Sequence, residues 1–140
     1  MRVKLGADSS SIDVRFDHTI IPATDATASA KFFAEIFGLP APVKAGFFQQ
    51  VRLTDGRIFD FAEPGVDFPG QHFAFLVNDH TFDRVVGLLA EWERDFWADP
   101  QRQHPGEVNH THGGRGVYFL DPAGHYLEAL TARYDGTSLD

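Results

Sequence analysis

The chain has 140 residues, 43% of them hydrophobic and 14% aromatic, which predicts one compact domain, or two very small pseudo-repeated halves, with a real core. Its formal net charge of −8 argues against binding to nucleic acid or to an anionic membrane surface, because both are negatively charged. The absence of cysteine excludes disulfides and thiolate metal sites, so His, Asp and Glu are the remaining strong metal ligands.

The first half of the chain follows a flexible leader, residues 1–13, that lacks the apolar core of a secretory signal. No apolar run is long enough to span a bilayer, so we expect a cytoplasmic protein without a membrane partner. Alternating apolar residues predict strands, and a cap at Asp25 followed by apolar residues at helical spacing predicts a helix ending at Gly38. The predicted order is a strand at 14–22, a helix at 28–37, and strands at 47–53 and 57–62.

The same order of elements returns in the second half. The predicted elements are a strand at 71–77, a helix with its buried stripe within 82–92, and strands at 116–120 and 125–131. A polar segment at 98–114 separates the helix from the last two strands. We therefore expect a first module at 14–64, a linker at 65–70, a second module at 71–132 and a tail at 133–140.

Ionisable residues recur at matched positions in the two halves. His18 and His72 each lie on the first predicted strand, seven residues before the aspartate expected to begin the helix. Asp60 and Glu128 each lie on the last strand, four residues after the turn glycine. A hydrophobic core does not require such a repeat, because burying unpaired charges is costly.

A divalent metal ion accounts for this repeat. Two imidazoles and one or two carboxylates form the mixed nitrogen and oxygen set that suits Fe, Mn, Ni, Co or Zn. The residues alone therefore predict an α+β chain of two similar halves whose histidines and carboxylates meet at one metal ion.

Three segments resemble a known family: FDHTIIPATDATASAKFFAEIFGL, QHFAFLV and GVYFLDPAGHYLEAL. The chain resembles the vicinal oxygen chelate superfamily, which contains glyoxalase I, fosfomycin resistance enzymes, bleomycin resistance proteins and extradiol dioxygenases. The resemblance implies two tandem βαβββ modules that form a curled mixed sheet around a metal cleft. It also implies a homodimer, with the site formed either within one chain or across two chains.

The resemblance assigns roles to the repeated residues. His18 and His72 match the two histidine ligands of the single divalent ion, and Glu128 matches the carboxylate ligand on the last strand. Asp60 matches the second carboxylate of glyoxalase-type members. Because aspartate is one methylene shorter than glutamate, Asp60 would bind the metal directly, through water, or as a hydrogen-bond partner of a ligand.

Further residues match positions that contact substrate. Tyr118 lies ten residues before Glu128, where related enzymes carry a substrate-contacting tyrosine. His110 or His112 lies near the position of an active-site histidine of extradiol enzymes, whereas a solvated loop is the simpler interpretation of both. His104 has no assigned role.

Three functions remain open for a small substrate chelated through adjacent oxygens. In a glyoxalase-like lyase or isomerase, Asp60 or Glu128 would take a proton from carbon. In an extradiol-type dioxygenase, which three protein ligands would favour, Tyr118 and His110 or His112 would move protons. The alternative to an enzyme is a small-molecule or antibiotic binding protein without redox chemistry, which the presence of the His and Glu set disfavours.

Overall fold

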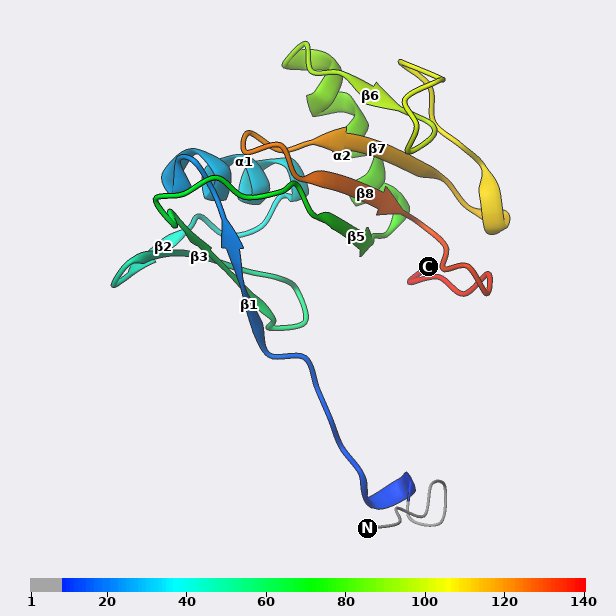
Figure 1. Cartoon of the computed structure of the whole chain (residues 1–140). Coiled ribbons are helices and arrows are strands. Elements are labelled where there is room, and N and C mark those ends of the chain that lie inside the picture. The colour runs from blue at the N-terminus through cyan, green and yellow to red at the C-terminus, as the bar shows by residue number, and fades with distance from the viewer. Residues whose placement is uncertain (1–8) are drawn as a thin grey trace.

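The structure is a computed structural model that describes residues 9–140, so most of the predicted leader, residues 1–8, lies outside the described residues. Two α-helices and eight strands occur in the described part (Figure 1). The elements are, in chain order, β1 (His18–Pro22), α1 (Ala26–Phe37), β2 (Val43–Ala45), β3 (Phe48–Arg52), β4 (Ile58–Ala62), β5 (His72–Leu76), α2 (Asp79–Glu91), β6 (Phe96–Trp97), β7 (Gly116–Leu120) and β8 (Tyr126–Leu130).

The two halves have the same topology. The strand order is β1-β4-β3-β2 in the first sheet and β5-β8-β7-β6 in the second. In each sheet the first strand pairs in parallel with the last, and the other pairs are antiparallel. The predicted duplication of a βαβββ module is thereby confirmed.

The register of the strands is also repeated. Asp60 lies opposite Ile20, two residues after His18 on β1. Glu128 lies opposite Ala74, two residues after His72 on β5. Because directly paired residues project to the same side of a sheet and alternate residues share a face, each histidine lies on the same face as the carboxylate of its module.

Local sequence signals account for the helix ends. The Asp25 side chain accepts a hydrogen bond from the Ala28 N–H at 3.0 Å, and Gly38 ends α1 with a φ of +70°, a conformation that glycine adopts at little cost. Asn78 caps α2 in the same way, accepting from the Thr81 N–H at 2.9 Å.

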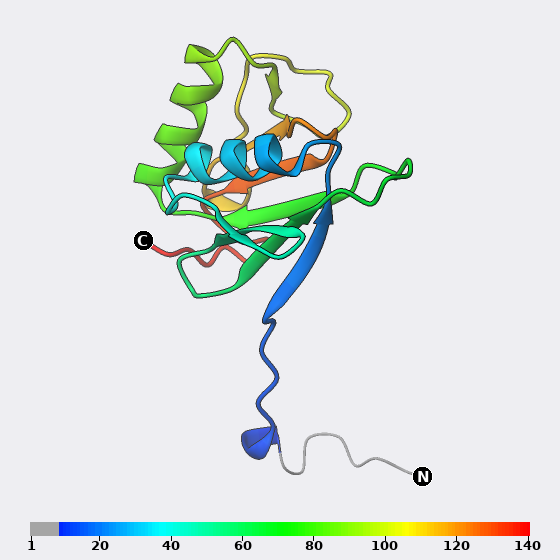
Figure 2. The same cartoon turned by 90° about the vertical axis from the view of Figure 1, so that its left-hand side faces the viewer.

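Two features differ from the sequence expectation. The strand predicted from residue 14 begins at His18, because residues 14–17 are extended without a ladder partner and project away from both helices (Figures 1 and 2). The short strands β2 and β6 were not predicted, since strands of three and two residues are too short to show a period.

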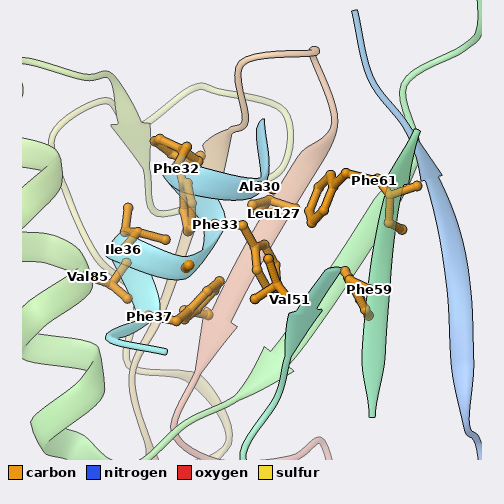
Figure 3. Packing of buried hydrophobic residues seen from close by; sticks show 14 of the residues in the cluster. Ala30, Phe32, Phe33, Ile36, Phe37, Val51, Phe59, Phe61, Val85 and Leu127 are labelled. Carbon is orange, nitrogen blue, oxygen red and sulfur yellow. The ribbon is translucent and has the colours of Figure 1, made fainter. Parts of the chain in front are cut away.

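The core is built from aromatic rings at the junction of the two modules (Figure 3). Phe33 on α1 lies 5.1 Å from the ring of Phe59 and 5.7 Å from that of Phe61, both on β4. It also lies 5.2 Å from the ring of Phe75 on β5. The helix of the first module therefore buries its apolar face against strands of both modules.

Polar contacts also link the two modules. Arg84 on α2 donates from Nε and Nη2 to the Glu35 carbonyl near the end of α1, at 3.1 and 2.8 Å. The buried His125 contacts the Pro22 carbonyl on β1 through Nε2 at 2.7 Å. The helices and these contacts join the halves, whereas no strand ladder links the two sheets within the described residues.

The single curled sheet expected around a cleft is thus present as two separate four-stranded sheets in one chain. Both β1 and β5 are edge strands in this arrangement. No helix of residues 9–140 has the length and apolar character needed to cross a membrane.

Candidate metal and substrate site

The second sheet brings His72 and Glu128 together. His72 Nε2 lies 3.1 Å from Glu128 Oε1. The Glu128 side chain is 5% exposed, whereas that of His72 is 49% exposed, so the carboxylate is buried behind an imidazole that faces solvent. A buried carboxylate needs a charged or hydrogen-bonding partner, and the imidazole supplies one.

Tyr118 completes this group from β7. It lies directly opposite Glu128 in the ladder, and its ring stacks on that of His72 with the centroids 6.3 Å apart. Burial, together with the Glu128 carboxylate, raises the pKa of Tyr118 to about 12. Tyr118 therefore retains its phenolic proton at neutral pH, and its hydroxyl is hydrogen-bonded to Glu128.

The first sheet carries the matching pair in a different state. His18 is largely exposed, and its Nδ1 lies 2.8 Å from Asp17 Oδ2. Asp60 is 5% exposed, and one of its carboxylate oxygens is buried without a hydrogen-bond partner among the described residues. A buried oxygen without a partner is costly. A cation, or a hydrogen-bond donor from outside the described residues, would therefore stabilise the Asp60 carboxylate.

The four predicted ligands fall into two pairs. Within residues 9–140, no three His, Asp or Glu side chains are gathered closely enough to hold a metal ion. His18 and Asp60 lie on the first sheet, and His72 and Glu128 on the second. One chain therefore presents two half-sites, each with one histidine and one carboxylate, and whether the site forms within one chain or across two stays a prediction.

The loop histidines occupy different surroundings. His112 lines a cavity of about 340 Å³ that also contains Tyr118 and Glu128, and its ring lies 4.9 Å from that of Tyr134. His110 instead lines a neighbouring cavity with Arg115. The structure thus brings His112, and not His110, into one cavity with Tyr118 and Glu128 of the second module.

His104 has a local role. Its Nδ1 lies 3.5 Å from Glu107 Oε2, and both side chains are more than half exposed. Its backbone N–H donates to Asp99 Oδ1 at 2.9 Å. His104 is therefore part of the loop and does not join the half-sites.

Sequence reasoning missed three residues beside His72. Trp97, Arg102 and Tyr126 line a mainly apolar cavity of about 290 Å³ that also contains His72 and Tyr118. The strand pattern could have pointed to Tyr126, which lies directly opposite His72. Arg102 lies in an irregular loop, so no periodic signal in the sequence could locate it.

Comparisons with known proteins place the chain in a family. Solved structures similar to it include the oxidase ChaP-H1, at 46% identity over 88% of this chain and 99% of that one, with a TM-score of 0.85. The oxidase ChaP-H2 is 43% identical over 89% of this chain and 98% of that one, with a TM-score of 0.85.

A more distant structure is a glyoxalase/dioxygenase from Nostoc punctiforme, 25% identical over 93% of this chain and 97% of that one, with a TM-score of 0.64. No protein-family model matches the chain, and no curated protein matches it. The duplicated βαβββ topology, the repeated register and these similarities show that the chain belongs to the vicinal oxygen chelate superfamily.

Proposed function

We propose that the protein is a metal-dependent oxidase of small molecules that works as a homodimer. One divalent ion, of Fe, Ni, Zn, Mn or Co, would be held by His72 and Glu128 of one subunit together with His18 and Asp60 of the partner subunit. The observation that carries this proposal is the presence, in one chain, of two complementary half-sites with a common register.

The donor atoms fit a divalent cation. Two imidazoles and two carboxylates form a mixed nitrogen and oxygen set, which suits the transition metals named above. The buried Asp60 oxygen has no partner within the described residues, and a cation would provide one. The Asp60 oxygen is itself buried, so bulk solvent does not supply that partner.

The exposed edge of the first sheet supports a second copy as the partner. Among residues 9–140, β1 pairs only with β4 and β5 only with β8, which leaves one edge of each strand open to pairing with another chain. Phe16 and Ile20, along the same edge, are each 56% exposed. A twofold dimer that places β1 of one subunit beside β5 of the other would bury these side chains and bring the half-sites together twice.

Similarity to two proteins described as oxidases favours oxidation over the lyase and isomerase reactions. A bound ion would stabilise negative charge on two adjacent substrate oxygens, and a redox-active ion such as iron would also exchange electrons. Tyr118 stays protonated at neutral pH, and its O–H, which contacts Glu128 in the free chain, would be able to turn to a substrate oxygen once Glu128 binds the ion. Glu128, which lies 3.1 Å from His72 Nε2, would bind the ion next to the imidazole.

The test of the shared site is complementation between two defective variants. His18→Ala and His72→Ala are each expected to lose metal, measured by inductively coupled plasma mass spectrometry, while the exposed His80→Ala control keeps it. When His18→Ala and His72→Ala chains are co-expressed, a mixed dimer has one site with both histidines intact. Random pairing then restores about a quarter of the wild-type metal content, because half the dimers are mixed and each has one intact site.

The outcomes separate the alternatives. No recovery in the mixed preparation, or a monomer by light scattering, would refute a site shared between chains. Metal-dependent oxygen uptake with catechols would support an oxidase, and turnover of methylglyoxal–thiol adducts without oxygen uptake would instead identify a lyase. A purified protein that takes up no metal even after reconstitution would identify a binding protein.

A further inference from the structure

Arg102 lines the cavity beside His72, where its guanidinium lies over two aromatic rings. Its guanidinium carbon lies 5.2 Å from the ring centre of Trp97 and 5.1 Å from that of Tyr126. Its backbone has a φ of +61°, a left-handed conformation that costs free energy for any residue other than glycine. The surrounding loop must therefore hold this residue in place.

Hydrogen bonds around Asp99 hold the loop. The Asp99 carboxylate accepts from the backbone N–H groups of Gln103, at 2.9 and 3.0 Å, and of His104, at 2.9 Å. The Asn109 side chain donates to the Ala98 carbonyl at 2.8 Å, which fixes the start of the same loop. The position of Arg102 is thus set by the loop, and the two rings restrict its side chain further.

The guanidinium has no hydrogen-bond or ion-pair partner among the described residues. Arg115, by contrast, pairs with Asp79 and Asp83 at 2.8 Å each. Asp99 also lines the cavity, but its carboxylate is engaged by the backbone N–H groups of the loop. Arg102 therefore keeps its N–H donors available to a bound molecule.

The cavity has one cationic lining residue, and its walls are mainly apolar and aromatic in the described chain. His72 and Tyr118 lie in the same cavity as Arg102. A molecule whose adjacent oxygens face His72 would extend along Tyr126 and Trp97 toward the guanidinium. An ionised oxygen acid matches the fork of donors that arginine presents.

We propose that Arg102 is a specificity-determining residue that binds an ionised oxygen acid, a carboxylate or a phenolate, on the part of the substrate remote from the His72–Glu128 pair. This inference rests on the proposed function for the orientation of the substrate. The recognition of an anion by Arg102 can nevertheless be measured without metal.

The test compares acids with neutral molecules of the same shape. Binding of benzoate and benzamide to the metal-free, full-length protein is measured by isothermal titration calorimetry. The pair 3,4-dihydroxybenzoate and 3,4-dihydroxybenzamide is then measured with the metal-loaded protein. We expect the acid of each pair to bind about fivefold or more tightly than the amide, since a partly exposed charged contact contributes about 1 kcal/mol.

Substitutions identify the group responsible. Arg102→Gln is expected to remove the preference for the acid while leaving binding of the amide unchanged, and Arg102→Lys is expected to retain part of the preference. Arg94→Gln is the matched control, because Arg94 also lies over an aromatic ring, that of Phe32 at 4.7 Å, but does not line the cavity.

Several results would overturn the inference. For the wild type, they are equal binding of acid and amide, or no binding of benzoate at millimolar concentration. For Arg102→Gln, they are an undiminished preference for the acid, or an equal loss of affinity for the acid and the amide of a pair. A preference that survives in the benzoate pair while the protein takes up no metal would refute the proposed function alone. Normal metal uptake without any preference would refute only the role of Arg102.

Discussion

His125 provides a test of how the two modules are joined. Its imidazole is fully buried, and Nδ1 accepts a hydrogen bond from the Gln71 N–H at 3.0 Å. Nε2 therefore carries the proton and donates to the Pro22 carbonyl at 2.7 Å. The rings of Phe68 and Phe73 lie 5.5 and 5.7 Å from the imidazole. The residue thus connects the turn before β8 with the strand β1 of the other module.

Replacing His125 by leucine keeps the apolar volume and removes both hydrogen bonds. The Gln71 N–H and the Pro22 carbonyl lose their partner, and each buried polar group left without one costs about 1–3 kcal/mol. Because both hydrogen bonds are only partly buried, we expect the free energy of unfolding to fall by about 2–4 kcal/mol. His125→Gln, which can donate and accept, is expected to lose less.

Urea denaturation followed by circular dichroism measures this change. All variants must be compared at one protein concentration, because dimer formation would make the midpoint depend on concentration. His80→Leu is the control, since His80 is exposed on α2 and its substitution is expected to change the free energy by less than about 0.5 kcal/mol. A loss below about 1 kcal/mol for His125→Leu would refute the assignment of these two hydrogen bonds as a stabilising link.

Substitutions at four further positions test other parts of the fold. Asp25→Ala removes the acceptor for the Ala28 N–H and is expected to cost about 1 kcal/mol in urea denaturation; Asp25→Asn should restore most of it, and equal losses in both would contradict a capping role. Gly70→Ala would place a Cβ 2.6 Å from the Gly124 carbonyl oxygen and should destabilise the protein by about 1–3 kcal/mol. Gly87→Ala, with open space around the new Cβ in α2, should stabilise it by about 0.5–1 kcal/mol. A higher melting temperature for Gly70→Ala than for Gly87→Ala would be inconsistent with this packing. Burial raises the pKa of Asp121 despite hydrogen bonds from the backbone N–H groups of His125 and Ala123. The protonated carboxyl therefore stabilises the folded state at low pH, and this stabilisation is lost as the pH rises through the raised pKa. Asp121→Asn should therefore gain stability relative to the wild type as the pH rises from 4 to 7, and a difference between them that does not change with pH would disprove this interpretation.

The periodic and repeated features of the sequence determined the fold. The apolar run at 116–120 located β7 at its observed bounds, and the cap at Asp25 and the expected first helical residue Asp79 located the starts of α1 and α2, because these signals depend on neighbouring residues alone. The matched spacing of His18 and His72 identified the duplication, since two copies of one module repeat their register as well as their topology.

The tertiary structure alone decided how these modules are arranged. Rings from both halves pack around Phe33, and His18 and His72 lie on two separate sheets, with no group of three potential ligands gathered within the described residues. The placement of Arg102 over Trp97 likewise depends on a loop held by Asp99, whose hydrogen bonds follow no period. Local spacing fixes which residues share a strand face, but long-range packing fixes which faces meet.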